Sequence, residues 1–135
     1  MSLIAWDNGF SVGVKAIDEQ HKGLFGIVNE LHTAMMQRQA KNVTGGVLTK
    51  LVRYTCDHFS FEEKVMRATN YPGLIHHRAV HLDLTKQVQE FLGRYERGGA
   101  SLNIQLLRFL SDWLTGHIQH EDKEYGPWLN QHGIQ

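Results

Sequence analysis

The sequence has a single cysteine, no long apolar run and no excess of either charge, and each absence excludes a class of protein. Cys56 cannot form a disulfide within the chain, which fits the reducing cytoplasm where we expect the protein to reside. No apolar run approaches the roughly 18 residues that span a bilayer, and the start of the chain lacks the basic and apolar regions of a secretory signal. Lys plus Arg and Asp plus Glu number 14 each, so the charge favours neither nucleic acid nor an anionic membrane as partner.

Histidine, in contrast, is abundant, with nine in 135 residues. A chain of this length forms one domain around a single core, and we find no repeat of fixed period, low-complexity tract or second domain in it. Imidazoles in an apolar core are costly unless they have partners. Their positions relative to the apolar pattern therefore indicate what they do.

Four segments carry apolar residues at helical spacing. The predicted helices cover roughly 18–38, 43–67, 73–97 and 102–121. Gly, Pro or Asn interrupts the pattern between them, and the connections are short. Short connections favour antiparallel neighbours, so the sequence predicts an all-α fold, an up-down-up-down antiparallel four-helix bundle.

Residues 1–16 precede these helices and are predicted to form an extended arm packed on the bundle. The apolar side chains of this arm are Trp6, Phe10, Val12 and Val14. Arm and bundle together form one domain, residues 1–135, and the balanced charge leads us to expect a monomer.

Residues of the types that bind metals interrupt the apolar face of each predicted helix. They are His21 in the first, His58 and Glu62 in the second, His77 and His81 in the third, and His117 in the fourth, followed by Asp122. Residues four apart on a helix point the same way, which applies to both pairs. One buried histidine is more often a hydrogen-bonded core residue than a ligand, but five of them with a carboxylate at helical spacing favour a metal site.

The number of candidate ligands favours two metal ions over one. Seven ligands are too many for one tetrahedral zinc. Two octahedral ions offer about twelve positions, of which five imidazoles, two bridging carboxylates and a shared oxo or hydroxo group fill about eleven. One position therefore stays open, where a small diatomic molecule could bind.

The last of these ligands has an unusual spacing, because Asp122 follows His117 by five residues. On an ideal helix this spacing turns the two side chains about 140° apart. We expect a local distortion near residues 118–122, either a π-type bulge or the end of the fourth helix.

Other residues of ligand type are expected to bind no metal. They are an exposed His76, a His120 at the surface or behind the ligands, a hydrogen-bonded core or rim His32, a Cys56 that points away from His58, and solvated carboxylates at Glu63 and Glu121.

The ordered motifs resemble those of hemerythrins, specifically of a free-standing bacterial hemerythrin. The matching stretches are IDEQH ending at His21, HFSFE from His58, HRAVH from His77 and HIQHED from His117, with the arm WDNGFSVGVKAID and the tail DKEYGPWL also similar. A single H-x-x-x-E or H-x-x-x-H motif is common, whereas this set, with one on each helix, is specific. The resemblance covers nearly the whole chain.

The resemblance implies a non-enzymatic protein that binds O2 reversibly at two non-haem Fe ions, for carriage, storage or delivery of O2 to a client protein that consumes it. It assigns His77, His81 and His117 to one iron and His21 and His58 to the other, with Glu62, Asp122 and an oxo or hydroxo group bridging both. It places O2 at the iron with two histidines, in a pocket lined by Leu24, Phe59, Trp113, Leu114 and Ile118.

Two other functions of the same centre stay open. The first is a di-iron oxidase, peroxidase or nitric-oxide reductase, but the sequence lacks the Glu-x-x-His motif of ferritin-like oxidases. Neutral imidazoles also supply less negative charge than carboxylates, and should stabilise high-valent iron less well. The second is a sensor of O2, redox state or nitric oxide, which would need a separate partner because the sequence ends 13 residues after Asp122.

Overall fold

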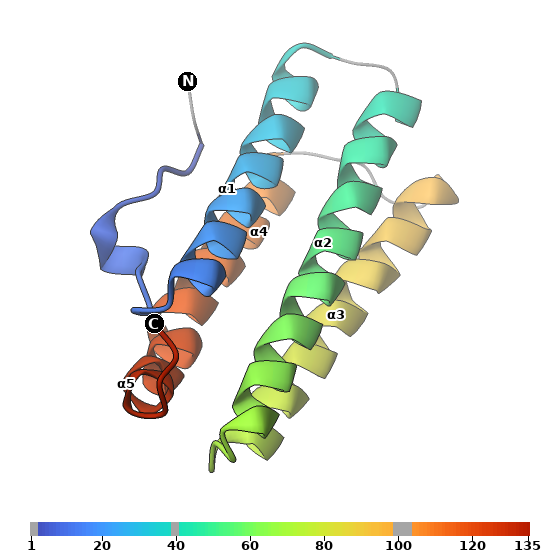
Figure 1. Cartoon of the computed structure of the whole chain (residues 1–135). Coiled ribbons are helices and arrows are strands. Elements are labelled where there is room, and N and C mark those ends of the chain that lie inside the picture. The colour runs from blue at the N-terminus through green and yellow to red at the C-terminus, as the bar shows by residue number, and fades with distance from the viewer. Residues whose placement is uncertain (1–2, 39–40, 99–103) are drawn as a thin grey trace.

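The computed structural model describes residues 3–38, 41–98 and 104–135, and these form a bundle of four long antiparallel helices (Figure 1). Their bounds are α1 Lys15–Met36, α2 Lys41–Ala68, α3 Leu74–Glu96 and α4 Ile104–His117. The predicted all-α, up-down-up-down architecture is confirmed. The predicted start of the fourth helix, at residue 102, and the first two residues of the arm lie outside the described residues.

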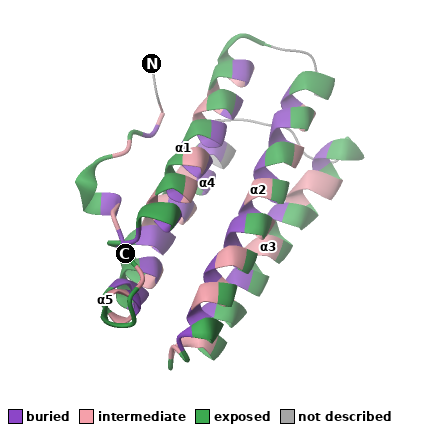
Figure 2. Cartoon of the chain, in the orientation of Figure 1, coloured by how far each residue is buried: buried purple, intermediate pink, exposed green. Residues whose placement is uncertain are grey.

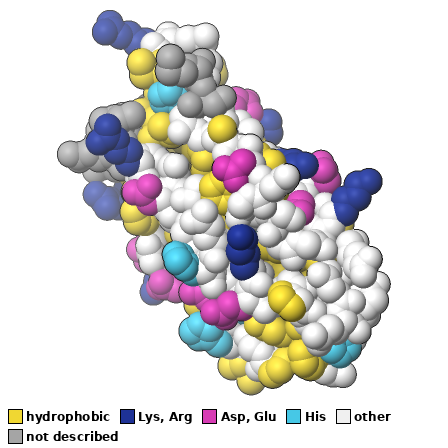
Figure 3. Space-filling view, turned by 90° about the vertical axis from the view of Figure 1, so that its left-hand side faces the viewer, with side chains coloured by type: hydrophobic (Ala, Val, Ile, Leu, Met, Phe, Trp, Pro, Cys, Tyr) yellow, Lys and Arg dark blue, Asp and Glu magenta, His cyan; other side chains and the backbone are white. Residues whose placement is uncertain are grey.

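The helices pack in chain order, with α1 along α2, α2 along α3, and α4 returning beside α1 (Figure 1). Their buried positions lie on the inward faces (Figure 2), because apolar residues three and four apart form one stripe on each helix. Acidic and basic side chains are interspersed on the face shown in Figure 3. None of the described helices is long and apolar enough to cross a bilayer.

Two hydrophobic clusters fill the bundle. The large cluster includes Leu24, Val28, Leu31, Leu48, Leu51, Val88, Leu107, Leu110, Leu114 and Ile118. The small cluster contains the buried residues Val12, Val14, Ile17, Met66, Tyr125 and Leu129. Helices α1, α2 and α3 change from one cluster to the other at their polar positions; on α1, for example, His21 lies between Ile17 and Leu24. After α4 the change comes between Ile118 in η2 and Tyr125 in α5. The polar residues therefore form a layer between two apolar regions.

The N-terminal arm packs on the bundle as predicted and includes the short 3-10 helix η1, Asn8–Phe10. Two hydrogen bonds join it to the middle of α1: the Ile4 N–H donates to Asn29 Oδ1 (3.0 Å), and Asn29 Nδ2 donates to the Ile4 carbonyl oxygen (2.8 Å). Near the start of α1, the Asp18 carboxylate accepts hydrogen bonds from the Ser11 hydroxyl (2.6 Å) and the Val12 N–H (2.9 Å). These contacts hold the arm at both ends.

The chain stays helical beyond α4. A π-helix, η2, covers Ile118–Asp122, and α5 follows at Lys123–Gln131. Of the two distortions expected here, the π-type bulge is confirmed. Helix α5 was not predicted, because its Gly126-Pro127 pair is typical of a turn. Gly126 is buried in α5, and its lack of a side chain lets the helix lie against the arm.

We expect Gly126→Ala to lower the free energy of unfolding by about 1–3 kcal/mol, as overpacking does. A Cβ at this position would lie 2.2 Å from the carbonyl oxygen of Val12, so the backbone of the arm would have to move. Gly26→Ala is the matched control, because a Cβ there would meet no described atom within 4 Å. The control should be neutral or stabilising by up to about 1 kcal/mol. Urea denaturation of the metal-free proteins measures both, and equal effects would contradict the close approach of arm and α5.

Candidate metal centre

The seven predicted ligand residues all lie in the polar layer, and none is more than 8 % exposed. They are His21 on α1, His58 and Glu62 on α2, His77 and His81 on α3, His117 at the end of α4, and Asp122 at the end of η2. Every long helix thus contributes at least one side chain.

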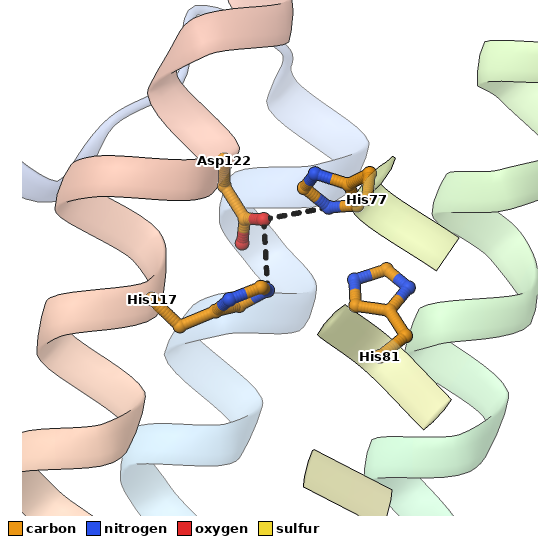
Figure 4. A group of neighbouring side chains, drawn as sticks. All are labelled: His77, His81, His117 and Asp122. Carbon is orange, nitrogen blue, oxygen red and sulfur yellow. Dashed lines mark ion pairs between the residues drawn. The ribbon is translucent and has the colours of Figure 1, made fainter. Parts of the chain in front are cut away.

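The candidate ligand atoms of these residues form two groups, and within each group they lie within 4.8 Å of one another. The three-histidine group consists of His77, His81, His117 and Asp122 (Figure 4), and the two-histidine group of His21, His58, Glu62 and Asp122. Two ligands on opposite sides of an ion with bonds of about 2.1 Å lie about 4.2 Å apart. The spacing in each group is therefore close to that around one ion.

Asp122 links the two groups by turning one oxygen toward each. Its Oδ1 lies 3.1 Å from Nε2 of both His77 and His117 (Figure 4), in the three-histidine group. Its Oδ2 lies 3.0 Å from His21 Nε2, in the two-histidine group. The wide π-turn makes this possible, because it returns Asp122 to the face of the helix that carries His117.

Glu62 divides its oxygens in the same way. Its Oε1 contacts His58 Nε2 and lies 3.7 Å from His21 Nε2. Its Oε2 lies 3.2 Å from His77 Nε2 and 3.9 Å from His81 Nε2. Both carboxylates thus stand between the two groups of imidazoles.

Many polar atoms in this layer approach one another without hydrogen-bond geometry. Among the described residues, the buried atoms without a hydrogen-bond partner include both ring nitrogens of His21 and His117, Nε2 of His58 and His81, Oε1 of Glu62, and both oxygens of Asp122. Buried polar atoms are costly without partners. A metal ion in each group would satisfy the Nε2 atoms and the carboxylate oxygens among them, so the donor set fits a pair of ions.

The buried histidines and carboxylates of the layer shift one another's pKa values. Burial lowers the pKa of His21 and His77, but their contacts with Asp122 and Glu62 outweigh it and raise the pKa to about 9 and about 10. Burial lowers the pKa of His81 to about 4. Although burial raises a carboxyl pKa, the surrounding histidines hold the pKa of Glu62 and Asp122 well below the ordinary range. His21 and His77 therefore hold a proton more tightly than an ordinary imidazole does, and a metal ion that binds them must displace it.

Two of the imidazoles have a partner on their outer side. His58 Nδ1 donates to Gln20 Oε1 (2.6 Å), and His81 Nδ1 donates to Glu63 Oε2 (3.0 Å). The expectation that Glu63 is merely solvated is wrong, because its carboxylate lies between His81 and Arg78 and its side chain is only 19 % exposed. Sequence analysis also missed Gln20. Both residues adjoin a ligand in the sequence and bond to an imidazole on the neighbouring helix, a pairing visible only when the helices are packed.

The other residues of ligand type lie outside both groups. His76 is exposed, as predicted, and its Nε2 lies 3.7 Å from a Glu121 oxygen. His120 is exposed at the surface. His32 is half-buried, and its Nδ1 has no hydrogen-bond partner in the described part of the chain. Cys56 is half-buried and belongs to neither group.

Of the five predicted pocket residues, Leu24, Phe59, Leu114 and Ile118 are buried and Trp113 is half-buried. Phe59 has the clearest relation to the metal groups. Its ring stacks on His81 with centroids 3.7 Å apart and planes 4° from parallel, and its centroid lies 5.8 Å from that of His117. Its centroid is 6.0 Å from that of His58, so Phe59 borders both groups.

The chain is similar in sequence and structure to known hemerythrins. The model of the hemerythrin HHE cation binding domain matches residues 12–129, which include the whole polar layer. A bacteriohemerythrin of Stenotrophomonas maltophilia is 34% identical over 132 residues, covering 98% of this chain and 85% of that protein. A bacteriohemerythrin of Methylococcus capsulatus is 34% identical over 131 residues, covering 96% and 99%. A crystal structure of wild-type hemerythrin matches with a TM-score of 0.90 and 33% identity, covering 95% and 98%.

Substitution of the neighbouring histidines 76 and 77 tests whether the polar layer binds metal ions. We expect His77→Ala to bind about one metal ion fewer per chain than the wild type, because it lacks an imidazole that contacts both carboxylates. His76→Ala removes an exposed imidazole and should leave the metal content unchanged. Metal analysis after dialysis gives the stoichiometry. An ion at 100 times its Kd stabilises the fold by about 2.7 kcal/mol, so added metal should raise Tm less in His77→Ala. Equal metal content in both variants would contradict the assignment.

Proposed function

Because this chain belongs to the hemerythrin family, we propose that it binds O2 reversibly at a pair of iron ions held in the polar layer. The observation that carries the proposal is the division of the two carboxylates. Glu62 and Asp122 each turn one oxygen toward the two-histidine group and the other toward the three-histidine group. This is the arrangement that two bridged ions require.

The proposed ligands follow the two groups. His77, His81 and His117 hold one iron, and His21 and His58 hold the other. Glu62 and Asp122 would each offer one oxygen to either iron. The two-histidine group offers one imidazole fewer than the other, and O2 would bind at the iron held there.

When bound, the irons supply the electrons that O2 accepts and later returns. The chain's own contribution is to hold the donors rigidly and to exclude water. Imidazoles, which bind a metal ion in their neutral form, outnumber carboxylates five to two in the layer, so the residues would supply little negative charge to stabilise highly oxidised iron. This composition supports reversible binding, for carriage, storage or delivery of O2, over catalytic oxidation.

The apolar residues around the layer keep charged products from leaving. Leu24, Leu114 and Ile118 are each at most 2 % exposed and belong to the large cluster. We propose that they line the O2 pocket with Phe59 and Trp113. Release of superoxide or peroxide into such apolar surroundings is unfavourable, because an unpaired charge is poorly solvated there.

The test is to load the protein with iron, reduce it without air, and follow visible spectra through cycles of air and argon. We expect two irons per chain and a charge-transfer band that appears with O2 and vanishes under argon. Asp122→Asn should abolish this behaviour, because it removes the charge of a bridging carboxylate. Asp112→Asn, which alters an exposed carboxylate on α4, is the matched control and should behave as wild type. Conversion to a ferric form within one cycle, with peroxide released or a substrate consumed, would overturn the proposal.

The pocket has its own test, the autoxidation rate of the O2-loaded protein. Leu24→Ser places a hydroxyl and space for water three residues after His21, on the same face of α1. We expect severalfold faster autoxidation. Leu31→Ser is the control, since Leu31 is equally buried on that face but lies two turns farther along. Each variant should lose about 2–5 kcal/mol of stability, so the rates are compared at a temperature where both are folded. Equal acceleration in the two variants would show that the effect is not local to the pocket.

A further inference from the structure

The outer sides of the two metal groups differ in one respect. In each group one imidazole donates its Nδ1 proton to a side chain: His58 to Gln20 in the two-histidine group, and His81 to Glu63 in the three-histidine group. Nδ1 of His21 and of His117 has no hydrogen-bond partner among the described residues. In the described part of the chain, each group thus has one imidazole hydrogen-bonded to a side chain on its outer side, an amide in one group and a carboxylate in the other.

The two supports constrain their imidazoles differently. An ionised carboxylate only accepts hydrogen bonds, so Glu63 requires the proton of His81 to be on Nδ1 and leaves the Nε2 lone pair toward the cluster. An amide both donates and accepts, so rotating the amide group of Gln20 would satisfy either tautomer of His58. His81 is therefore held in its metal-binding tautomer, whereas His58 is not.

The supports also differ in charge. Glu63 places a negative charge behind His81, and hydrogen bonding to a carboxylate makes an imidazole a more basic ligand. Arg78 Nε lies 3.5 Å from the Glu63 carboxylate, but the Arg78 side chain is 57 % exposed while that of Glu63 is 19 % exposed. Water screens the exposed guanidinium, and its charge only partly offsets that of Glu63. Gln20 adds no charge behind His58.

We propose that Glu63 and Gln20 make the two metal positions unequal: Glu63 makes the three-histidine position the tighter one, and Gln20 keeps the two-histidine position the weaker one. The inference rests on the pair of metal positions in the proposed function. It assigns to Glu63 a positioning role, exerted through His81. The three-histidine position already has one more imidazole than the other, and Glu63 widens the difference in affinity, so a carboxylate outside the ligand set contributes to the order of metal loading.

The test uses Zn²⁺, which has no redox chemistry, added stepwise to the metal-free protein labelled with ¹⁵N at histidine. NMR of the ring nitrogens reports both the tautomer and the order of filling, and calorimetry gives the two affinities. In the wild type, we expect His81 to carry its proton on Nδ1. The first equivalent of Zn²⁺ should shift the ring-nitrogen signals of His77, His81 and His117.

Glu63→Gln should weaken Zn²⁺ binding at the three-histidine position by about 10–100-fold, the range typical of the loss of a hydrogen-bond partner behind a ligand. Gln20→Glu should strengthen Zn²⁺ binding at the two-histidine position. It should therefore also narrow the difference between the two affinities.

Glu121→Gln is the matched control. It removes one negative charge near the layer, but the Glu121 carboxylate faces the exposed His76 and touches no member of either group. This variant should keep the wild-type affinities. The inference would be overturned if Glu63→Gln left the two affinities as unequal as in the wild type. It would also be overturned if Glu121→Gln changed them as much as Glu63→Gln does. Neither result would affect the proposed O2 binding. A wild type that took up only one Zn²⁺ would instead contradict the pair of positions on which both proposals rest.

Discussion

The sharing of two buried carboxylates among five imidazoles is the constraint on which the rest of this structure depends. A charge buried without a partner costs several kcal/mol, a large part of the 5–15 kcal/mol that is typical of the net stability of a domain. Glu62 and Asp122 avoid this cost because each oxygen faces a histidine from another part of the bundle. The four long helices must therefore keep their positions along the bundle axis and their rotations about their own axes. A shift of one helix would separate a carboxylate oxygen from the histidine that it faces.

The hydrophobic core is arranged around this requirement. The polar layer interrupts the apolar stripe of each helix, and a hydrophobic cluster lies on each side of it. The two clusters have different origins: the large one consists mainly of the long helices, whereas the small one also needs the arm and α5. The hydrogen bonds that the Asp18 carboxylate accepts from the arm, and the close approach of Gly126 to Val12, thus close the apolar region behind the candidate metal centre. The N-terminal arm and the C-terminal helix are parts of the site's enclosure.

Much of this could be predicted from the sequence because the signals are local. Apolar spacing gave four helices, short connections gave their antiparallel order, and donor chemistry singled out His21, His58, Glu62, His77, His81, His117 and Asp122. The five-residue spacing before Asp122 also predicted a distortion near residues 118–122, either a π-type bulge or the end of the helix, and the structure has the π-helix. Helix α5 escaped prediction because its Gly126-Pro127 pair has the signature of a turn, and only contact with the arm explains why a glycine is needed there. Glu63 was misjudged because its partner belongs to another helix.

The division between sequence and structure has a single physical reason. Within one helix, the angle between two side chains depends only on their separation in the sequence, so the sequence by itself determined which residues share a face and which donors the core contains. Between helices, that angle depends on how each pair packs. Only the tertiary structure decided that each carboxylate divides its oxygens between the two groups, and that an amide supports His58 while a carboxylate supports His81.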